Sequence, residues 1–273
     1  SAPNDSRNDI VVRGNSPTGL LWRLEGIPIP NPNHFSAAGT TGGPVSAVNP
    51  NVLKNSDFLT SAFPAEFGNA LGGVFDLGFR KGNADTYEFT AQVGAFTGVE
   101  VMGEGPLNQK NGSFLVAARY SLVGLLGAGA GGTSATPNYS DLSFNVDFGK
   151  SKAGNFSLFG ILGTSDIDFL GDDIDETDLF AAEDEDLFVR SKFVASGIKH
   201  QFQLNENTYW RSIASVSFSE SNITANRFIN KDTPQERQIL FTDSDNIENR
   251  LAISTLLNSK FSNRFTLRSG VLW

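Results

Sequence analysis

The feature that most constrains this chain is a two-residue alternation of apolar and polar side chains, which recurs from Tyr87 to the end of the sequence. In "DLSFNVDFG" every second residue is apolar, from Leu142 to Phe148, and the residues between them are polar. The stretches "TYEFTAQVGAF", "YWRSIASVSFSE" and "NRLAISTLLNSKF" alternate in the same way. Successive side chains of a β-strand point to opposite sides of the sheet, so each stretch predicts a strand with one apolar and one polar face.

Short and long connections separate these strands in turn. Short turns are expected at 108–112, 150–154, 204–207 and 261–264, and long polar connections at about 123–140, 170–188 and 229–247. The strands themselves are expected to run for about 10–15 residues, longer than the ~5–6 that are usual in globular sheets. An up-and-down meander with tight turns on one rim and long loops on the other is typical of outer-membrane barrels. A soluble sandwich also alternates, so the pattern favours the membrane barrel over the sandwich without excluding it.

The alternation also assigns the two faces of the sheet. The surface predicted to face lipid consists of Phe89, Val93, Val116, Phe144, Val146, Val216, Phe218, Leu251 and Ile253. The inward surface is predicted to include Gln92, Arg119, Asn145, Lys199, Arg211, Arg250 and Arg268. Aromatic residues expected to form a girdle near the strand ends are Tyr87, Tyr209, Trp210, Phe261, Phe265 and Trp273. Because polar and charged inward side chains need water or partners, the lumen is expected to be wide or occupied.

Composition and motifs exclude several functional classes. The 273 residues carry 21 Lys and Arg against 30 Asp and Glu, a formal net charge of -9, and no basic patch, so nucleic acid is not an expected partner. The chain has no Cys, and no apolar run approaches the ~18 residues of a membrane helix. It shows no Ser-His-Asp grouping, no cysteine nucleophile and no histidine-rich metal spacing, so it is not expected to be an enzyme.

Residues 1–85 differ in character from the strands that follow. The stretch "DIVVRGNSPTGLLWRLEGIPIPNP" predicts two short strands, and Asn49-Pro50 predicts the start of a short helix over 51–55. "DFLTSAF" and "FGNALGGVFDLGF" predict a third and a fourth strand around a glycine turn. This unit has too few apolar residues for a good core of its own, so it is expected to pack inside something larger.

The succession "VVRGNSP", "LEGIPIP" and "FPAEFGNALGGVFDLGFRKGN" resembles the later part of the plug domain of TonB-dependent outer-membrane receptors, in wording similar to those of Bacteroidetes-type bacteria. The resemblance covers about residues 9–83. It implies a mainly β protein with a small mixed α/β plug segment at 1–85, incomplete at its amino terminus. Part of a large antiparallel transmembrane β-barrel would follow at 86–273, with about nine of the family's ~22 strands.

The resemblance implies a receptor in the outer membrane of a Gram-negative bacterium that imports a scarce or large substrate. A siderophore, a cobalamin, a glycan or a peptide would each fit this class. The implied partners are outer-membrane lipid, TonB through a segment that precedes this sequence, and a surface lipoprotein. The competing interpretation is a small outer-membrane barrel with a structural or adhesive role that ends at Trp273. Further alternating strands in the parent reading frame would favour the receptor, and a stop codon the small barrel.

The resemblance also implies a plug–barrel interface, in which Arg13 would form a buried ion pair with the barrel; the alternative is a residue that caps a turn. Many plugs of the family carry an Arg-Gly-Pro step where this sequence reads Ala62-Phe63-Pro64-Ala65, so only Arg13 carries over to that role. The other residues expected in the interface are Glu25, Gly68, Gly72 and Gly73, the glycines because a side chain there would collide with the barrel wall.

Two further sites are expected in loops. Family plugs present an apical loop to the substrate, which corresponds here to 29–42 and in particular to Asn31, Asn33, His34 and Phe35. The acidic run "GDDIDETDLFAAEDEDL" at 171–187 is a candidate Ca²⁺ site, with Asp172, Asp173, Asp175, Glu176 and Asp178 as ligands. The alternative for the acidic run is a solvated, self-repelling loop. No other cofactor is expected.

Overall fold

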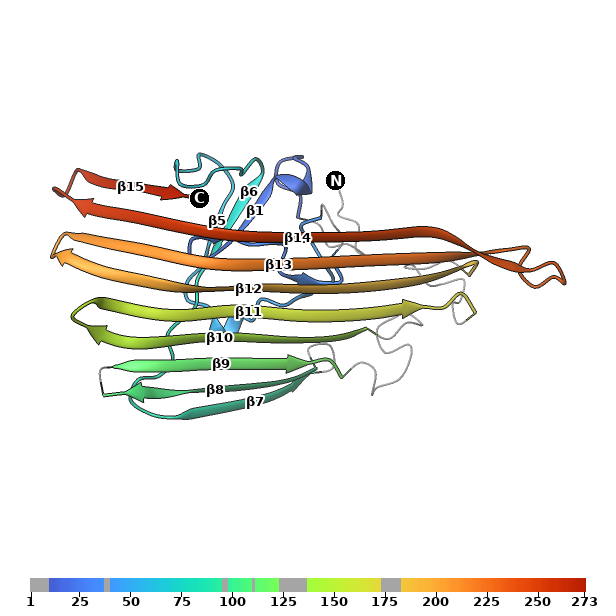
Figure 1. Ribbon diagram of the computed structural model, residues 1–273, viewed down its shortest axis with the longest axis horizontal. Helices are drawn as coiled ribbons and strands as arrows, with labels where there is room; N and C mark the ends of the chain where they lie inside the picture. Colours follow the sequence, from blue (N-terminus) through green and yellow to red (C-terminus); the bar gives the residue numbers. More distant parts are fainter. Residues whose placement is uncertain (1–9, 37–39, 95–97, 110, 123–136, 173–182) are drawn as a thin grey trace.

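The computed structural model describes residues 10–36, 40–94, 98–109, 111–122, 137–172 and 183–273. In these residues a small four-stranded sheet lies against one face of a nine-stranded sheet (Figure 1). The nine strands form an antiparallel meander in which each strand pairs with its neighbours along the sequence. The predicted fold class, mainly β with part of a large antiparallel barrel sheet, is confirmed.

The nine-stranded sheet, called the wall below, makes up most of the chain. Its strands are β7 (Glu88–Gly94), β8 (Gly98–Asn108), β9 (Gly112–Tyr120), β10 (Asn138–Ser151), β11 (Gly154–Phe169), β12 (Glu185–Asn205), β13 (Thr208–Ile229), β14 (Arg237–Lys260) and β15 (Thr266–Leu272). The residues before it, called the plug, contain η1 (Pro17–Gly19), β1 (Leu20–Leu24), β2 (Ile27–Pro28), β3 (Asn33–His34), β4 (Val45–Ser46), η2 (Pro50–Val52), β5 (Asp57–Leu59) and β6 (Gly73–Leu77). The predicted division between 85 and 86 falls in the connection from β6 to β7.

The plug sheet has the strand order β2-β1-β6-β5, with β1 and β6 parallel. The Asn49 side chain caps η2 by accepting a hydrogen bond of 2.9 Å from the Asn51 N–H, and Pro50 follows it as predicted. The helix is shorter than expected and ends at Val52. The strand predicted from residue 10 is wrong, since Val12 to Asn15 form a turn closed by a backbone hydrogen bond of 3.0 Å. No helix in the described ranges is long and apolar enough to cross a membrane.

The pairing registers separate the two faces of the wall. All nine residues predicted to face lipid lie on the face away from the plug, and five of them share one cross-strand row: Phe89, Val116, Phe144, Val216 and Leu251. The residues predicted to point inward lie on the opposite face, toward the plug. A one-residue slip would exchange the faces, so the apolar pattern and the plug contacts specify the same register.

Strands β12, β13 and β14 are much longer than expected, at 21, 22 and 24 residues. A strand needs only ~9–11 residues to cross a bilayer. On β13 the outward face is apolar at Val216 and Phe218 and becomes polar at Glu220 and Asn222. The far ends of these strands therefore project beyond the apolar band, most visibly in the β13–β14 hairpin (Figure 1).

The loops predicted at 170–188 and 229–247 are correspondingly too long. Strand β12 already begins at Glu185 and β14 at Arg237. Strand β14 does not alternate in this region: Ile239, Leu240 and Phe241 are consecutive apolar residues, and residues 242–246 are all polar. Such residues lose the apolar alternation that marks a strand in sequence, although their backbone hydrogen bonds continue the ladder.

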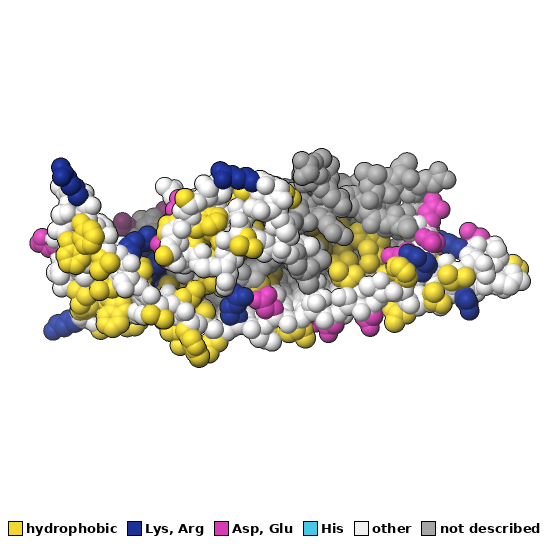
Figure 2. All heavy atoms as spheres, turned by 90° about the horizontal axis from the view of Figure 1, so that it is seen from above, with side chains coloured by type: hydrophobic (Ala, Val, Ile, Leu, Met, Phe, Trp, Pro, Cys, Tyr) yellow, Lys and Arg dark blue, Asp and Glu magenta, His cyan; other side chains and the backbone are white. Residues whose placement is uncertain are grey.

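Exposed aromatic side chains gather at the rim of the short turns. Trp210, Phe261 and Phe265 are all exposed there, and Figure 2 shows large hydrophobic side chains at this end of the molecule, on the left. This position suits the interfacial girdle of a membrane barrel. Three members of the predicted girdle lie elsewhere. Tyr209 points inward, where its hydroxyl accepts a hydrogen bond of 3.2 Å from Asn258. Trp273 lies opposite Ile253 in the middle of the wall, and Tyr87, just before β7, belongs to the same cross-strand row.

Candidate functional site: the plug–barrel interface and its cavity

The segment that connects the plug to the wall is fixed by a bidentate ion pair. The Arg80 guanidinium donates to both carboxylate oxygens of Glu104 on β8, at 2.6 and 2.7 Å, and its Nε donates to the Asn51 carbonyl at 2.7 Å. Glu104 is buried and also accepts a 2.8 Å hydrogen bond from the Asn83 N–H. Paired hydrogen bonds between guanidinium and carboxylate fix both distance and angle. Arg80 was not among the interface residues expected from the sequence, although the basic pair Arg80-Lys81 shortly before the first wall strand is a signal for such a role.

The next two residues continue this attachment. The Lys81 ammonium lies 2.5 Å from the buried Asp147 carboxylate on β10. At Gly82 an added Cβ would lie 2.0 Å from the Phe114 carbonyl oxygen of β9. Since real side chains do not approach a backbone oxygen so closely, only glycine lets the connection pass at this distance from the wall.

Glu25 forms a second attachment, on β12. It occupies the β1–β2 turn with φ of 56° and is buried. One carboxylate oxygen lies 2.6 Å from the Lys199 ammonium of β12, and the other accepts a 2.8 Å hydrogen bond from the Phe79 N–H. The structure therefore places this predicted interface residue between plug and wall.

The other residues expected in this interface lie elsewhere. Arg13 is exposed in a turn with φ of 53°, and no described carboxylate is placed to form an ion pair with it. Gly68 is exposed, with open space where a Cβ would stand. At Gly72 and Gly73 the nearest atoms belong to the plug itself, such as the Leu20 side chain at 3.0 Å from a Cβ added to Gly73. The expectation that these glycines avoid the wall is wrong; Gly73 instead starts the β6 strand inside the plug sheet, and Gly82 is the glycine that passes close to the wall.

The apical loop is held to the wall by a buried charged cluster. Asp141 on β10 accepts hydrogen bonds from His34 Nε2 at 3.0 Å and from Arg119 Nη2 at 2.6 Å, and Arg119 also donates to the Ser46 carbonyl at 2.5 Å. The His34 side chain is completely buried, with its ring centre 4.9 Å from that of Tyr139. Three segments that are distant in sequence thus meet at one carboxylate.

The four residues predicted to contact substrate have different roles in the structure. Asn31 lines a cavity, and its amide donates to the Gly42 carbonyl at 2.8 Å. Asn33 and His34 are buried in contacts that shape the loop and dock it, so they do not line the cavity. The Phe35 N–H donates to Ser165 and Ser191 of the wall at 3.1 and 3.2 Å. The predicted apical loop lies beside a cavity, but the sequence does not tell which of its side chains line that cavity.

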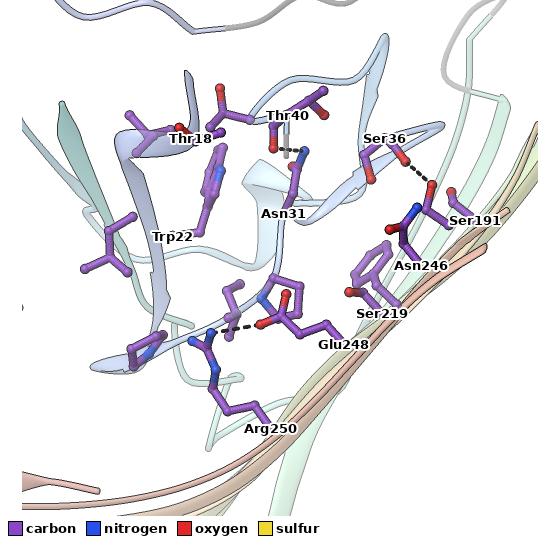
Figure 3. A pocket seen from close by; sticks show the side chains of 18 of the residues that line it. Thr18, Trp22, Asn31, Ser36, Thr40, Ser191, Ser219, Asn246, Glu248 and Arg250 are labelled. Carbon is purple, nitrogen blue, oxygen red and sulfur yellow. Dashed lines mark hydrogen bonds and ion pairs between the residues drawn. The ribbon is translucent and has the colours of Figure 1, made fainter. Parts of the chain in front are cut away.

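A cavity of about 570 Å³ separates the plug from β12, β13 and β14. Figure 3 shows the plug side, with Trp22, facing wall side chains that carry hydroxyl and amide groups. The lining residues labelled there are Thr18, Trp22, Asn31, Ser36, Thr40, Ser191, Ser219, Asn246, Glu248 and Arg250. Glu248 and Arg250 form an ion pair of 2.8 Å, so the two charges neutralise each other.

The indole of Trp22 is fixed by other rings of the plug sheet. It stacks on Phe75 with ring centres 4.3 Å apart, and Phe75 stacks on Phe58 at the same distance. The three residues are cross-strand partners on β1, β6 and β5. Such stacking restricts side-chain rotation, so the cavity has a rigid aromatic wall on the plug side.

Most of the acidic run falls outside the described residues. This applies to Asp173, Asp175, Glu176 and Asp178. Asp172 is exposed, and its carboxylate lies 3.1 Å from the Lys231 ammonium. Within the described part of the chain, no three His, Asp or Glu side chains are grouped to hold a metal ion. The Ca²⁺ site stays a prediction.

The docking of the plug is expected to weaken below pH 6.5. Burial lowers the pKa of His34 from its ordinary value of 6.5, although the hydrogen bond to Asp141 opposes the shift. The docked plug therefore favours neutral His34, and the released plug binds the proton more readily. The contribution of His34 to the stability of the docked plug is fully present above pH 6.5 and is lost as the pH falls toward the lowered pKa.

A single cysteine reports this release, because the chain has none of its own and Ala47 is fully buried in the plug. In the Ala47→Cys protein, the urea concentration at which a maleimide reacts should be lower at pH 5.5 than at pH 7.5. His34→Gln, which keeps an N–H donor for Asp141, should reduce this pH dependence. An unchanged pH dependence in the His34→Gln protein would show that other groups cause it.

No protein-family model matches the sequence, and no curated protein sequence matches it. Solved structures of outer-membrane receptors share its fold, among them the following two. The pyoverdine outer membrane receptor FpvA from Pseudomonas aeruginosa PAO1 matches 92% of this chain with a TM-score of 0.63 and 11% identity. The ferric-catecholate import receptor Fiu from E. coli K12 matches 92% with a TM-score of 0.58 and 12% identity. The chain spans only 38% and 41% of these two proteins. Over that span, the chain shares the fold of these outer-membrane receptors.

Proposed function

We propose that this chain is the later plug and the first barrel strands of a TonB-dependent receptor, which resides in the outer membrane of a Gram-negative bacterium and imports a solute. The observation that carries the proposal is a separate plug unit, docked by buried ion pairs on the inward face of a sheet whose outward face is apolar. A wide barrel with a plugged lumen is the architecture of outer-membrane transporters. Transport, rather than catalysis, is the activity that follows from this arrangement.

The proposal also includes a class of substrate and the partners of the receptor. FpvA is bound to pyoverdine and Fiu is a ferric-catecholate import receptor, which supports a scarce solute of that kind. A siderophore, a cobalamin, a glycan or a peptide each fit. The plug motifs resemble those of receptors from Bacteroidetes-type bacteria, which supports an origin in such a bacterium and a surface lipoprotein as partner. TonB would bind a segment outside the 273 residues.

The test is deletion of the plug from the complete reading frame. Cells that express the receptor without residues 10–83 should become sensitive to vancomycin, because an unplugged wide barrel admits large solutes, whereas cells with the intact receptor should stay resistant. Membrane fractionation and heat-modifiability on gels check that both forms reach the outer membrane folded. A folded barrel that admits no vancomycin after the deletion would favour the small structural barrel, and a protein outside the outer membrane would contradict the proposal altogether.

A further inference from the structure

The plug is attached unevenly to the described wall. Its polar contacts concentrate on β8 to β12, through Glu100, Glu104, Arg119, Asp141, Asn145, Asp147, Ser165, Ser191 and Lys199. Several of these contacts involve buried carboxylates, whose separation from their partners is strongly unfavourable.

The attachment to β13, β14 and β15 is weaker in the residues that the structure describes. Ser221 donates a 3.1 Å hydrogen bond to the Ser36 carbonyl, and Arg268 lies 2.8 Å from Glu66. The Arg268 side chain is half exposed, so its ion pair is partly screened by water. Apolar contact continues through Ile213 and Ala252 of the shared core. Polar attachment is therefore sparse along this side of the plug.

The cavity lies on the same side. Its wall is formed in large part by inward residues of β13 and β14, such as Ser219 and Asn246 (Figure 3). Hydroxyl and amide groups exchange hydrogen bonds with water and polar solutes, and the single charged pair that Figure 3 labels there is internally neutral. Such a lining offers a polar solute many weak partners, and no unpaired charge among the labelled residues holds it in place.

We propose that imported solute passes between the plug and strands β13 and β14, through this cavity, while the plug stays docked on β8 to β12. The inference rests on the proposed function, because it concerns the route through the receptor. In the described residues, movement of the plug away from β13, β14 and β15 breaks one neutral hydrogen bond and one screened ion pair and weakens the attraction between Arg211 and Asp76. Movement away from β8 to β12 would instead expose several buried ion pairs at once.

The absence of cysteine in the chain allows a direct test with two tethers in the complete receptor. The cavity tether joins Ser36→Cys to Ser221→Cys, across the side that we propose to open. The matched control tether joins Asn51→Cys to Glu100→Cys, on the side that we propose to stay docked, where the native side chains are 3.0 Å apart. Both pairs are bridged by a short bifunctional methanethiosulfonate reagent, which dithiothreitol removes.

The readout is ion conductance across a planar bilayer as urea is added to weaken plug packing. The cavity tether should keep the conductance at the closed level at urea concentrations that open the untethered and control-tethered receptors, and dithiothreitol should restore opening. If both tethered receptors respond equally to urea, or if only the control tether keeps the conductance at the closed level, the proposed route is wrong. The proposed function would still stand, because the untethered receptor opens. A receptor that does not insert into the outer membrane would contradict the proposed function instead.

Discussion

Replacing Arg80 with alanine is expected to destabilise the docked plug more than any other single change to its polar contacts. The substitution removes both hydrogen bonds to Glu104 and leaves that buried carboxylate with the Asn83 N–H as its remaining plug partner. Breaking a buried pair by removing one partner costs about 3–5 kcal/mol, and partial exposure of Arg80 reduces this to roughly 2–4 kcal/mol. The urea concentration at which Ala47→Cys reacts with maleimide should fall accordingly.

Two variants control this experiment. Arg80→Lys keeps the charge but loses the second hydrogen bond, so it should fall between the parent and Arg80→Ala. Arg13→Ala removes the exposed arginine that the sequence had assigned to this role, and it should leave the urea midpoint almost unchanged. A larger effect for Arg13→Ala than for Arg80→Ala would mean that Arg13 finds a stronger partner outside the described residues and that the interface described here is secondary.

A charge on the outward face at mid-height is expected to destabilise the barrel by a similar amount. Val216 lies in the central row of the apolar band and is exposed on the face away from the plug. An arginine at the bilayer midplane costs ~2–4 kcal/mol in membrane barrels. In phospholipid vesicles, Val216→Arg should therefore lower the guanidinium concentration at which half of the complete barrel is unfolded. Unfolding is measured by heat-modifiability on gels.

The matched control lies three residues further along the same strand. Ser219 faces the cavity, which has room for a longer polar side chain, so Ser219→Arg should change the guanidinium midpoint much less. Spin labels at the two positions provide an independent check, since a label at residue 216 should respond to lipid-soluble relaxants and one at 219 to water-soluble relaxants. The reverse response would mean that the faces are exchanged.

These experiments also separate two kinds of stabilisation in the chain. The barrel depends on a backbone ladder and an apolar outer face, which Arg80→Ala does not touch. The plug depends on a small number of polar contacts to the wall, because its own four-stranded sheet buries little apolar surface without that wall. Plug release and barrel unfolding are therefore expected as distinct transitions.

The sequence by itself determined the strand order and both faces of the wall. These follow from local rules: a period of two assigns each side chain to a face wherever one face is apolar, as from Leu142 to Phe148. The same rules failed where the alternation breaks, as at the consecutive apolar residues Ile239 to Phe241, so the first residues of β14 from Arg237 were predicted as loop. Cap chemistry at Asn49-Pro50 was also readable, since it involves neighbouring residues alone.

Only the tertiary structure decided which charged residues join plug to wall. The sequence assigned this role to Arg13 alone, yet Arg13 is exposed and Arg80 binds Glu104. His34 becomes a buried docking residue because Asp141 lies opposite it, 107 positions away. Pairings of this kind depend on how two separately folded units meet, and neither periodicity nor local propensity contains that distance. The cavity has the same origin: it is the space that remains where the plug and strands β12 to β14 do not touch.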